Sequence, residues 1–491
     1  MSGVNVVVVG GGPVGMTAAL LLARYGVPTT VLEAAPSREM VGSRSICVQR
    51  DVLDILERAG VGAQVAEVGV TWTHGRTYYQ SHQVGEILFP ETGSAAFPPF
   101  VNTPQTVVEL LLEQRVAEEP LVDFRYGQRV TGLTQDESSV TVSTQDGSVT
   151  GSHCVAADGA HSAVRSLLGL PFDGMSFDDR FLIADIRADL GFTAERRFYF
   201  DPPWNPGRQV LVHPQPGGVW RIDWQVPADF DLANENLDDR IRKIVGDADY
   251  EIVWLSVYRF HQRRVPRMMD GRVLLAGDAA HVMSPFGARG LNSGIADADN
   301  LAWKIALDRQ ELAGPALLPS YDKERGAAAS ENLRVTGDTM RFLVPQTEED
   351  RAHRVDVLTR AITDESARAE IDSGRLATPF SYADSPLTTS GGTLCPDAQL
   401  MRGGRLRELT TFRVLTNWCD WRPADAWEHM VVGDMLPLEQ EDDTVLADAL
   451  GLKPRQAVLV RPDGHIAAVL TEPPGGIAAP VSAALRRATG W

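Results

Sequence analysis

The chain has 491 residues, enough for two or three domains with substantial cores, and its 44% hydrophobic and 23% charged residues are typical of a globular protein. Its formal net charge of −19 argues against sequence-independent binding to nucleic acid, because little positive charge remains to neutralise phosphates. The cysteines show no CxxC or histidine-paired spacing; they are Cys47, Cys154, Cys395 and Cys419. We therefore expect neither a metal site nor a disulfide framework, and a reducing, cytoplasmic setting.

The first predicted element is a buried strand over residues 4–9, a run dominated by valine. It is too short to span a membrane and lacks the basic start of a signal peptide, so we expect neither membrane association nor secretion. Gly10, Gly12 and Gly15 follow with GxGxxG spacing, and helix-forming residues 16–25 come next. A strand, a glycine turn and a helix in this order indicate a dinucleotide-binding unit.

Each glycine of this turn has its own expected role. Gly10 permits the tight turn, Gly12 lets a pyrophosphate approach the backbone, and Gly15 lets the helix pack closely on the strand. The pyrophosphate is expected at the start of the helix, beside Pro13 and Val14, where free N–H groups and the helix dipole favour an anion.

A carboxylate follows the second predicted strand. This strand, over residues 28–32, ends at Glu33, which can accept hydrogen bonds from both hydroxyls of an adenosine ribose and would repel a 2′-phosphate. Together with the glycine turn, Glu33 favours dinucleotide binding. The alternative is a glycine-rich turn that binds no ligand.

Further polar residues are dispersed along the next part of the chain. Arg44 lies in a basic loop before a predicted helix over 52–59, and Gln105 leads into a predicted helix over 107–118. Another strand ends just before Asp158, and Arg165 follows. These pieces form one site only if the chain leaves the first domain and returns to it.

Residues 171–268 contain alternating strand-like segments, which predict an antiparallel sheet that lies over the cofactor and is joined by 72–100. The predicted strands are 197–200, 209–213, 219–226 and 252–260. Many residues here are aromatic, and they form either the core of the sheet or a wall of a substrate pocket. Alternation places Trp220, Ile222 and Trp224 on one face and Arg221, Asp223 and Gln225 on the other. The sequence does not decide which face meets the pocket.

A second glycine-containing run, residues 272–304, bears on the class of reaction. A buried strand leads to Gly277 and Asp278, and a loop rich in proline and glycine precedes a helix that starts near Gly290. Apolar side chains recur along this helix at helical spacing: Leu291, Ile295, Ala298, Leu301, Ala302 and Ile305. The N-terminus of such a helix can stabilise an anionic ring by about 0.3–1 kcal/mol. Arg289 either adds a cation beside the ring or is an ordinary solvated side chain.

The C-terminal part changes character after a predicted helix over 317–343. Residues 348–371 are expected to be partly helical, and 385–392 form a linker rich in serine, threonine and glycine. Beyond the linker we predict strands over 412–415, 457–460 and 466–470 and a helix over 443–450. The last two strands flank an Arg-Pro-Asp-Gly turn, which predicts a hairpin.

Three motifs match a known family in order and spacing: GxGxxG at 10–15, a DG motif at 158–165 and a GD motif at 277–281. Over residues 1–345 the chain resembles the class A flavoprotein monooxygenases, the aromatic hydroxylases that include para-hydroxybenzoate hydroxylase, phenol hydroxylase and the polyketide hydroxylases. The resemblance implies an α/β fold with a Rossmann-like FAD-binding domain of the glutathione reductase type. It also implies an inserted antiparallel β-sheet substrate domain and a C-terminal thioredoxin-like domain.

The same resemblance implies domain boundaries and cofactor contacts. The FAD-binding domain is expected over 1–70, 101–170 and 269–345, and the substrate domain over 71–100 and 171–268. A helical segment and linker over 346–392 precede the thioredoxin-like domain at 393–491. In this scheme Glu33 holds the adenosine ribose, Arg44 follows the adenine or pyrophosphate, Gln105 lies beside the cofactor, Asp158 lies near the pyrophosphate and the NAD(P)H path, Asp278 holds the ribityl chain, and the loop 285–292 passes the flavin ring. The full set of expected cofactor contacts is Gly10, Gly12, Pro13, Val14, Gly15, Glu33, Arg44, Gln105, Asp158, Gly159, Arg165, Gly277, Asp278, Pro285, Gly287, Arg289, Gly290, Leu291 and Asn292.

The family chemistry implied is reduction of FAD by NADH or NADPH, formation of a flavin C4a-hydroperoxide with O₂, and transfer of one oxygen atom to a small aromatic substrate. A phenolic substrate needs a group that takes its proton. The candidates are His213, Asp223, Tyr199, Tyr258 and Arg221, each of which also has a structural interpretation. We predict catalytic roles for His213, Arg221, Tyr258 and Pro285.

Other functions remain open from the sequence. They are a tailoring or antibiotic-modifying oxygenase that acts on a polycyclic substrate by epoxidation or Baeyer–Villiger chemistry, a non-hydroxylating flavin reductase, and a non-enzymatic protein with the FAD fold. Retention of the loop 287–292 argues against the last. No second GxGxxG domain is evident, so NAD(P)H is expected to bind transiently. We expect a monomer or a homodimer.

Overall fold

In the computed structural model, the described residues are 5–39, 45–89, 95–192, 195–398, 405–408, 411–416, 423–432, 436–437, 449–474 and 476–491. Arg44, Cys419 and most of the helix expected over 443–450 lie outside these residues. Among the described helices, none combines the length and apolar character needed to cross a membrane.

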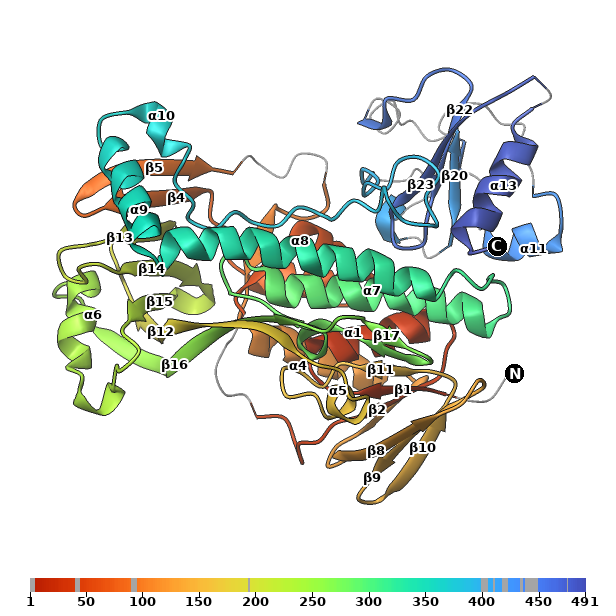
Figure 1. Cartoon of the computed structure of the whole chain (residues 1–491), viewed down its shortest axis with the longest axis horizontal. Coiled ribbons are helices and arrows are strands. Elements are labelled where there is room, and N and C mark those ends of the chain that lie inside the picture. Colours follow the sequence, from red (N-terminus) through yellow and green to blue (C-terminus); the bar gives the residue numbers. More distant parts are fainter. Residues whose placement is uncertain are drawn as a thin grey trace.

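A six-stranded sheet in the order β17-β18-β11-β1-β2-β7 forms the centre of the N-terminal half (Figure 1). Its strands are β1 (Val6–Val9), β2 (Thr29–Leu32), β7 (Val122–Arg125), β11 (Cys154–Ala156), β17 (Met269–Asp270) and β18 (Val273–Leu275). Neighbouring strands are parallel except for the pair β17 and β18. Every residue of β1 and β2 is buried, as expected for a parallel sheet covered on both faces.

The order of this sheet brings distant parts of the chain to one edge. Strands β18, β11 and β1 are neighbours in the sheet and run parallel. The residues that follow each of them therefore meet at the carboxyl edge of the sheet. Those residues are the glycine turn at 10–15, Asp158 and Gly277. The chain therefore does return to its first domain after the excursion, as a single site requires.

Helices and a smaller sheet cover the two faces of the six-stranded sheet. In Figure 1, α1 and α7 lie on one side and the three-stranded sheet β8-β9-β10 lies on the other. The elements of these layers are α1 (Pro13–Arg24), α4 (Gln105–Glu118), α7 (Arg289–Arg309), β8 (Val130–Gln135), β9 (Val140–Thr144) and β10 (Gly147–Gly151). Helix α1 packs closely on α7, and a Cβ atom at Gly294 would lie 2.7 Å from Val14 Cγ2. This approach requires glycine.

An eight-stranded sheet in the order β19-β16-β12-β15-β14-β13-β4-β5 extends from this layer. Its strands are β4 (His74–Tyr79), β5 (His82–Leu88), β12 (Asp173–Ala188), β13 (Arg196–Phe200), β14 (Gln209–Gln215), β15 (Val219–Val226), β16 (Tyr250–Arg264) and β19 (His281–Val282). The sheet is antiparallel except for the parallel pair β13 and β4. The sequence did not predict β12, because charged residues at 178–180 interrupt its apolar pattern where the register with β16 shifts.

Shorter elements connect these layers. They are β3 (Cys47–Gln49), β6 (Phe100–Asn102), α2 (Arg50–Arg58), α3 (Gly62–Val68), α5 (Ala163–Leu167), α6 (Leu237–Val245) and the 3₁₀ turn η3 (Gly277–Ala279). Strands β3 and β6 pair antiparallel in a separate two-stranded ribbon. This ribbon is joined to the large sheet, because Asn102 Nδ2 donates to the carbonyl of Pro214 at 2.9 Å.

The long helix α8 runs beside α7, and the C-terminal part follows it (Figure 1). After α10 the described chain continues through a segment over 369–398, and a four-stranded sheet in the order β21-β20-β22-β23 follows. The elements from α8 onward are α8 (Pro319–Leu343), α9 (Glu348–Arg360), α10 (Glu365–Arg368), α11 (Ala426–Val431), α13 (Ala478–Ala488), β20 (Arg413–Thr416), β21 (Leu436–Pro437), β22 (Gln456–Val460) and β23 (Ile466–Thr471). Strands β22 and β23 form the predicted hairpin around the turn at 461–464.

Candidate functional site

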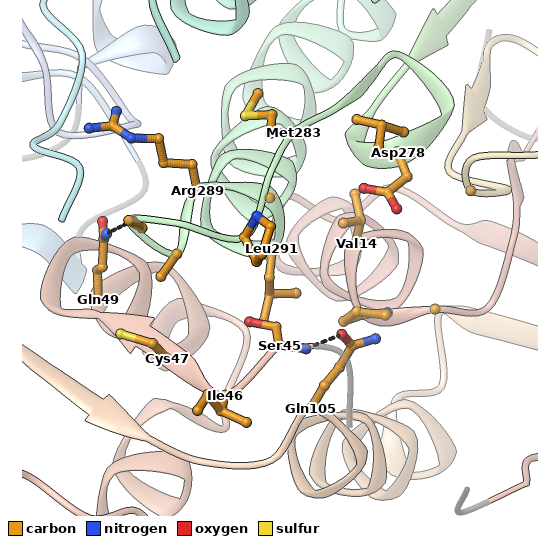
Figure 2. Close-up of a pocket in the computed structure, with 18 of the residues that line it drawn as sticks. Val14, Ser45, Ile46, Cys47, Gln49, Gln105, Asp278, Met283, Arg289 and Leu291 are labelled. Carbon is orange, nitrogen blue, oxygen red and sulfur yellow. Dashed lines mark hydrogen bonds between the residues drawn. The ribbon is translucent and has the colours of Figure 1, made fainter. Parts of the chain in front are cut away.

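A cavity of about 1360 Å³ lies between the carboxyl edge of the six-stranded sheet, the β3–β6 ribbon and one face of the eight-stranded sheet. It exceeds the roughly 300–1,000 Å³ typical of small-molecule sites, so it has room for a cofactor and a substrate together. Figure 2 shows its central part, around the N-terminus of α7. Fourteen predicted cofactor residues line it: Gly10, Gly12, Pro13, Val14, Glu33, Gln105, Asp158, Gly159, Asp278, Pro285, Gly287, Arg289, Gly290 and Leu291.

Other expected contacts lie behind this lining. Gly15 is one of them: a Cβ atom there would lie 2.0 Å from the carbonyl oxygen of Gly10, so glycine is needed for the packing of α1 on its strand. Gly277, Asn292 and Arg165 also lie outside the lining, and Arg44 falls outside the described residues.

The glycine turn after β1 presents the start of α1 to the cavity. Gly10 has φ +105°, and a Cβ atom there would lie 2.3 Å from the carbonyl oxygen of Ala157. At Gly12 a Cβ atom would meet no other atom within 4 Å, so the backbone itself faces the cavity. Gly12 is also the N-cap of α1, where no side chain satisfies the first N–H groups. A phosphate group fits such a helix start.

The carboxylate of Glu33 is held rigidly at the cavity wall. One oxygen accepts from the backbone N–H of Gly11 at 2.7 Å, and the other accepts from that of Ala35 at 2.8 Å. Each carboxylate oxygen keeps a further acceptor position. The group is therefore oriented to accept hydroxyl donors of a ribose.

The DG segment has its own internal bonding. Asp158 accepts from the Ser162 hydroxyl at 2.5 Å and from the backbone N–H of Val164 at 3.1 Å, and burial raises its pKa. Arg165 donates to the carbonyls of Ala160 at 2.7 Å and Ala279 at 3.0 Å. Arg165 therefore fastens the DG segment to the GD segment from outside the cavity.

The GD segment is anchored by a buried carboxylate that sequence reasoning did not single out. Asp297, on α7, accepts from the backbone N–H of Gly277 at 2.9 Å, from His281 Nε2 at 2.7 Å and from Arg325 Nε at 2.6 Å. Burial alone would raise the pKa of Asp297, but Arg325 and His281 together hold it below its usual value. The signal was an aspartate on the face of a helix that must pack on the core. Asp278, beside Gly277, lines the cavity near Val14 (Figure 2).

The loop before α7 is shaped by left-handed backbone. Gly287 has φ +83° and Ala288 has φ +55°, and a Cβ atom at Gly287 would lie 2.4 Å from the carbonyl oxygen of Arg375. Asn292 ties the start of α7 to the ribbon, because its amide donates to the Cys47 carbonyl at 2.9 Å and accepts from the Gln49 N–H at 3.0 Å. Pro285 lies in the cavity wall at the start of this loop.

Arg289 lines the cavity and is buried, so it is not the solvated loop side chain that was one of the two alternatives from the sequence. Its guanidinium donates to Asn332 at 2.5 Å and to the Arg375 carbonyl at 3.4 Å, and Figure 2 shows it directed away from Leu291. It is buried rather than solvated, and burial lowers its pKa. Gln105, on the opposite wall, accepts from the backbone N–H of Ser45 at 3.3 Å.

The eight-stranded sheet turns the polar face of β15 toward the cavity. Arg221 and Asp223 line the cavity, whereas Trp220 and Trp224 pack with Ile222 in a separate core beneath α6. The structure thus resolves the alternation that the sequence left open. His213 and Tyr258 also line the cavity, but Tyr199 packs on the other face, stacked on Tyr78 at 5.0 Å.

The polar groups of this wall differ in their electrostatics. Asp185 pairs with Arg221 through two hydrogen bonds of 2.8 Å each. Burial, together with the guanidinium groups of Arg196 and Arg221, holds the pKa of His213 well below its usual value. Burial raises the pKa of Asp223 to about 7. At neutral pH His213 is therefore uncharged, and Asp223 changes its protonation state near this pH.

Two further groups of lining residues were not predicted. Arg196, on β13, contributes a buried guanidinium, and the segment 374–379 crosses the cavity on its way to the C-terminal part. The segment carries no local motif, because its position results from the return of the chain along α8. Arg196 was not predicted because the sequence does not decide which face of the sheet, and so which residues of its strands, meets the cavity.

A carboxyl-edge cavity with a glycine turn, a carboxylate fixed by two backbone N–H groups and a helix start beside a loop is typical of a dinucleotide-binding oxidoreductase. Residues 3–336 match the FAD binding domain family. The chain belongs to this family and is a class A flavoprotein monooxygenase. The sequence-based recognition is thereby confirmed.

The relatives of the chain carry several different names. It is 31% identical over 339 residues to a para-nitrophenol 4-monooxygenase of Pseudomonas sp. (strain WBC-3), covering 65% of this chain and 82% of that protein. It is 30% identical over 479 residues to a dialkyldecalin synthase of Streptomyces rugosporus, covering 94% and 95%. The structure of the flavin-dependent monooxygenase PieE in complex with FAD and substrate superposes with a TM-score of 0.82 at 24% identity, covering 99% of both chains.

Proposed function

We propose that this FAD-dependent monooxygenase consumes NADH or NADPH and hydroxylates a small aromatic, phenolic substrate. The observation that carries this proposal is the shared cavity: the polar face of β15, with Arg221 and Asp223, meets the same space as the glycine turn and the start of α7. Bound FAD supplies the electron transfer and the activation of O₂. The protein supplies position, electrostatics and exclusion of water.

The cofactor half of the cavity is proposed to bind FAD along the carboxyl edge of the sheet. The N-terminus of α1 would bind the pyrophosphate. Glu33 would accept hydrogen bonds from the ribose hydroxyls, and Asp278 from the ribityl hydroxyls. The loop 285–290 and the start of α7 border the ring, where the helix dipole favours negative charge. Arg165 and Asn292 act as positioning residues, because their bonds hold neighbouring segments rather than the cavity itself.

Asp223 is the best placed group to take the proton of a phenol. It lines the cavity and its pKa is about 7, so near neutral pH it is available as a base and still has a driving force for proton transfer. His213 is a weaker base, because burial and then two adjacent guanidinium groups lower its pKa. We propose that His213 and Arg221 hold the substrate as hydrogen-bond donors, with Tyr258 and Pro285 shaping the cavity beside them.

Oxygen uptake by the FAD-loaded enzyme tests the proposal. With NADH and then NADPH as donor, a phenol panel is expected to stimulate oxygen uptake and give a product 16 mass units heavier. Peroxide release measures the uncoupled fraction. NAD(P)H oxidation with no oxygenated product would indicate a non-hydroxylating reductase and contradict the proposal.

A polycyclic substrate is the second candidate. The observation that favours it is the similarity, over 94% of this chain, to a protein named dialkyldecalin synthase. Product mass separates epoxidation and Baeyer–Villiger insertion, which each add 16 units, from cyclisation, which adds none. Conversion of a polycyclic substrate without oxygen uptake would favour the synthase alternative.

The arrangement of the remaining chain is also a proposal. We assign the FAD-binding domain to 1–70, 101–170 and 269–345, and the substrate domain to 71–100 and 171–268. The order β21-β20-β22-β23, with β20 parallel to β21 and antiparallel to β22, supports a thioredoxin-like fold for 393–491. The described cysteines Cys47, Cys154 and Cys395 are free thiols, which supports a cytoplasmic location. A monomer or homodimer is expected, and light scattering of the purified enzyme distinguishes them.

A further inference from the structure

The wall of the cavity formed by the large sheet contains a row of polar side chains on neighbouring strands. Cross-strand pairing places His213 opposite Arg221, Arg221 opposite Asp185, and Asp185 opposite Trp254. Arg196 extends this row onto β13, because its neighbour Arg197 pairs with Val212, next to His213. Residues that are directly opposite share one face of a sheet, so the row points into the cavity as a unit.

The charges along this row are unequally compensated. Arg221 is neutralised, because Asp185 accepts from its Nε and its Nη2 at 2.8 Å each and is further bonded by Gln215 Nε2 at 2.9 Å. Both carboxylate oxygens of Asp185 therefore already accept hydrogen bonds from side chains of this sheet. No carboxylate of the described residues forms an ion pair with Arg196.

Arg196 is a buried cation that faces the cavity. It is 8% exposed, and of its five N–H donors one donates to the carbonyl of Ser373 at 2.8 Å. The ring of Phe198 lies 5.2 Å from its guanidinium carbon. In the described part of the chain its other donors have no acceptor. A buried charge without a counter-ion is costly, and proteins retain one mainly where a ligand supplies the opposite charge.

His213 adds a second group without a protein partner. Its ring lines the cavity, and within the described residues it makes no hydrogen bond. Because its pKa is held well below the usual value, the ring is neutral and keeps one N–H to donate. Burial lowers the pKa of Arg196 to about 10, so the guanidinium remains charged at neutral pH. A cation and a neutral donor side by side favour an oxyanion.

We propose that Arg196 and His213 form an oxyanion subsite in the sheet wall, and that the substrate binds with an ionised carboxylate or an ionised acidic hydroxyl against it. This inference rests on the proposed function, because it concerns the substrate of the same cavity. It narrows the substrate class from aromatic compounds in general to acidic ones. Charge-assisted hydrogen bonds to a buried guanidinium correspond to roughly 10- to 100-fold in affinity.

Calorimetric titration of the FAD-loaded enzyme with matched probes tests the subsite. One arm compares 3-hydroxybenzoate with 3-hydroxybenzamide, and the other compares 4-nitrophenol, at a pH where it is ionised, with 4-nitroanisole. The wild type is expected to bind the anion of at least one pair at least tenfold more tightly than its neutral partner. The arm that shows the preference identifies carboxylate or phenolate. Equal affinities in both arms would overturn the proposal.

Substitution of Arg196 assigns the preference to this residue. Arg196→Gln is expected to bring the anion-to-neutral affinity ratio close to one, and Arg196→Lys to retain part of it. Arg354→Gln is the matched control. Like Arg196, Arg354 is buried, donates to a backbone carbonyl (at 3.0 Å) and has its guanidinium near a phenylalanine ring, 5.4 Å from that of Phe200. Unlike Arg196, it forms an ion pair, with Asp201 at 3.1 Å. The control is expected to keep the wild-type ratio. An unchanged ratio in Arg196→Gln would refute the subsite.

Two observations separate failure of the subsite from failure of the proposed function. Flavin absorbance shows whether each variant carries FAD, and oxygen uptake with a neutral phenol reports turnover without the anion. Hydroxylation with no preference for the anion would contradict the proposed subsite but not the proposed function. A preference for the anion without any oxygenated product would support the proposed subsite and contradict the proposed hydroxylase function.

Discussion

Arg461 of the C-terminal part forms two hydrogen bonds with Glu324 of α8, at 2.6 and 2.9 Å, and both side chains are buried. Lys304 of α7 donates to the same carboxylate at 2.7 Å, and Asp463 pairs with Arg461 across the hairpin turn. Two carboxylates and two cations are thus enclosed between α7, α8 and the last hairpin. The turn predicted from sequence as a simple hairpin signal is also the contact that attaches the C-terminal part.

Removal of Arg461 is expected to be strongly destabilising. Arg461→Met leaves Asp463 without its guanidinium and Glu324 with Lys304 alone, and breaking a buried ion pair from one side costs about 3–5 kcal/mol. The free energy of unfolding in urea measures the loss. Arg360→Met is the control, because Arg360 forms an equally bidentate pair with Glu370, 2.9 Å in each bond, at the surface. Its expected loss is about 0.2–1 kcal/mol. Similar losses for the two variants would contradict the expectation.

Asp223→Asn is expected to change the pH dependence of stability. Burial raises the pKa of Asp223 from 3.8 to about 7, so between these values the native state holds a proton that the unfolded state has released. The contribution of Asp223 to the free energy of unfolding of the wild type is therefore complete below pH 3.8 and decreases as the pH rises toward 7. The variant lacks this loss. Its stability relative to the wild type is expected to grow from pH 4 to pH 7 and then remain constant.

Urea unfolding of the substrate-free holoenzyme at pH 4.5, 6 and 8.5 measures this difference. Other groups, including His213, titrate in both proteins and cancel in the comparison. In the catalytic assay the same group acts as base only when ionised, so wild-type kcat is expected to rise with pH through about 7 and Asp223→Asn to lose this step. A stability difference that does not vary with pH would show that Asp223 titrates near its ordinary value.

Two glycines in adjacent helices are expected to respond oppositely to the same substitution. In Gly294→Ala the new Cβ would lie 2.7 Å from Val14 Cγ2 and 3.1 Å from Gly277 Cα, so α7 must move away from α1, at a cost of about 1–3 kcal/mol. In Gly326→Ala on α8 the nearest atom is Asp322 Oδ1 at 4.0 Å, and the alanine is expected to gain about 0.4–1 kcal/mol. Thermal unfolding of both variants tests the contrast. A stable Gly294→Ala protein would mean that the helices are not in close contact.

Local signals in the sequence were sufficient to predict the segments that meet at the carboxyl edge of the six-stranded sheet. The strand β1, the glycine turn and the GD loop depend on valine runs and on glycines at positions of positive φ or close approach, which are properties of adjacent residues. The sheet wall was not predictable in the same way. Arg196 and His213 become neighbours only through the register of β13, β14 and β15, and the face of β15 that meets the cavity depends on where the sheet packs. Asp297 is an intermediate case, since a carboxylate on a core-facing helix surface is a local anomaly, but its three partners come from distant segments.

Asp297→Asn is expected to weaken FAD binding as well as stability. The carboxylate is buried and anchors Gly277, His281 and Arg325 at once, so the neutral amide leaves Arg325 uncompensated and loosens the turn that carries Asp278. Fluorescence titration with FAD is expected to show at least about a tenfold loss of affinity, which corresponds to 1.4 kcal/mol. Asp299→Asn, on the same helix, breaks the buried pair with Arg58 at 2.5 Å and contacts no part of the GD turn. The control is expected to lose comparable stability and keep its FAD affinity. Equal FAD affinity in the two variants would show that Asp297 stabilises the helix without positioning the GD turn.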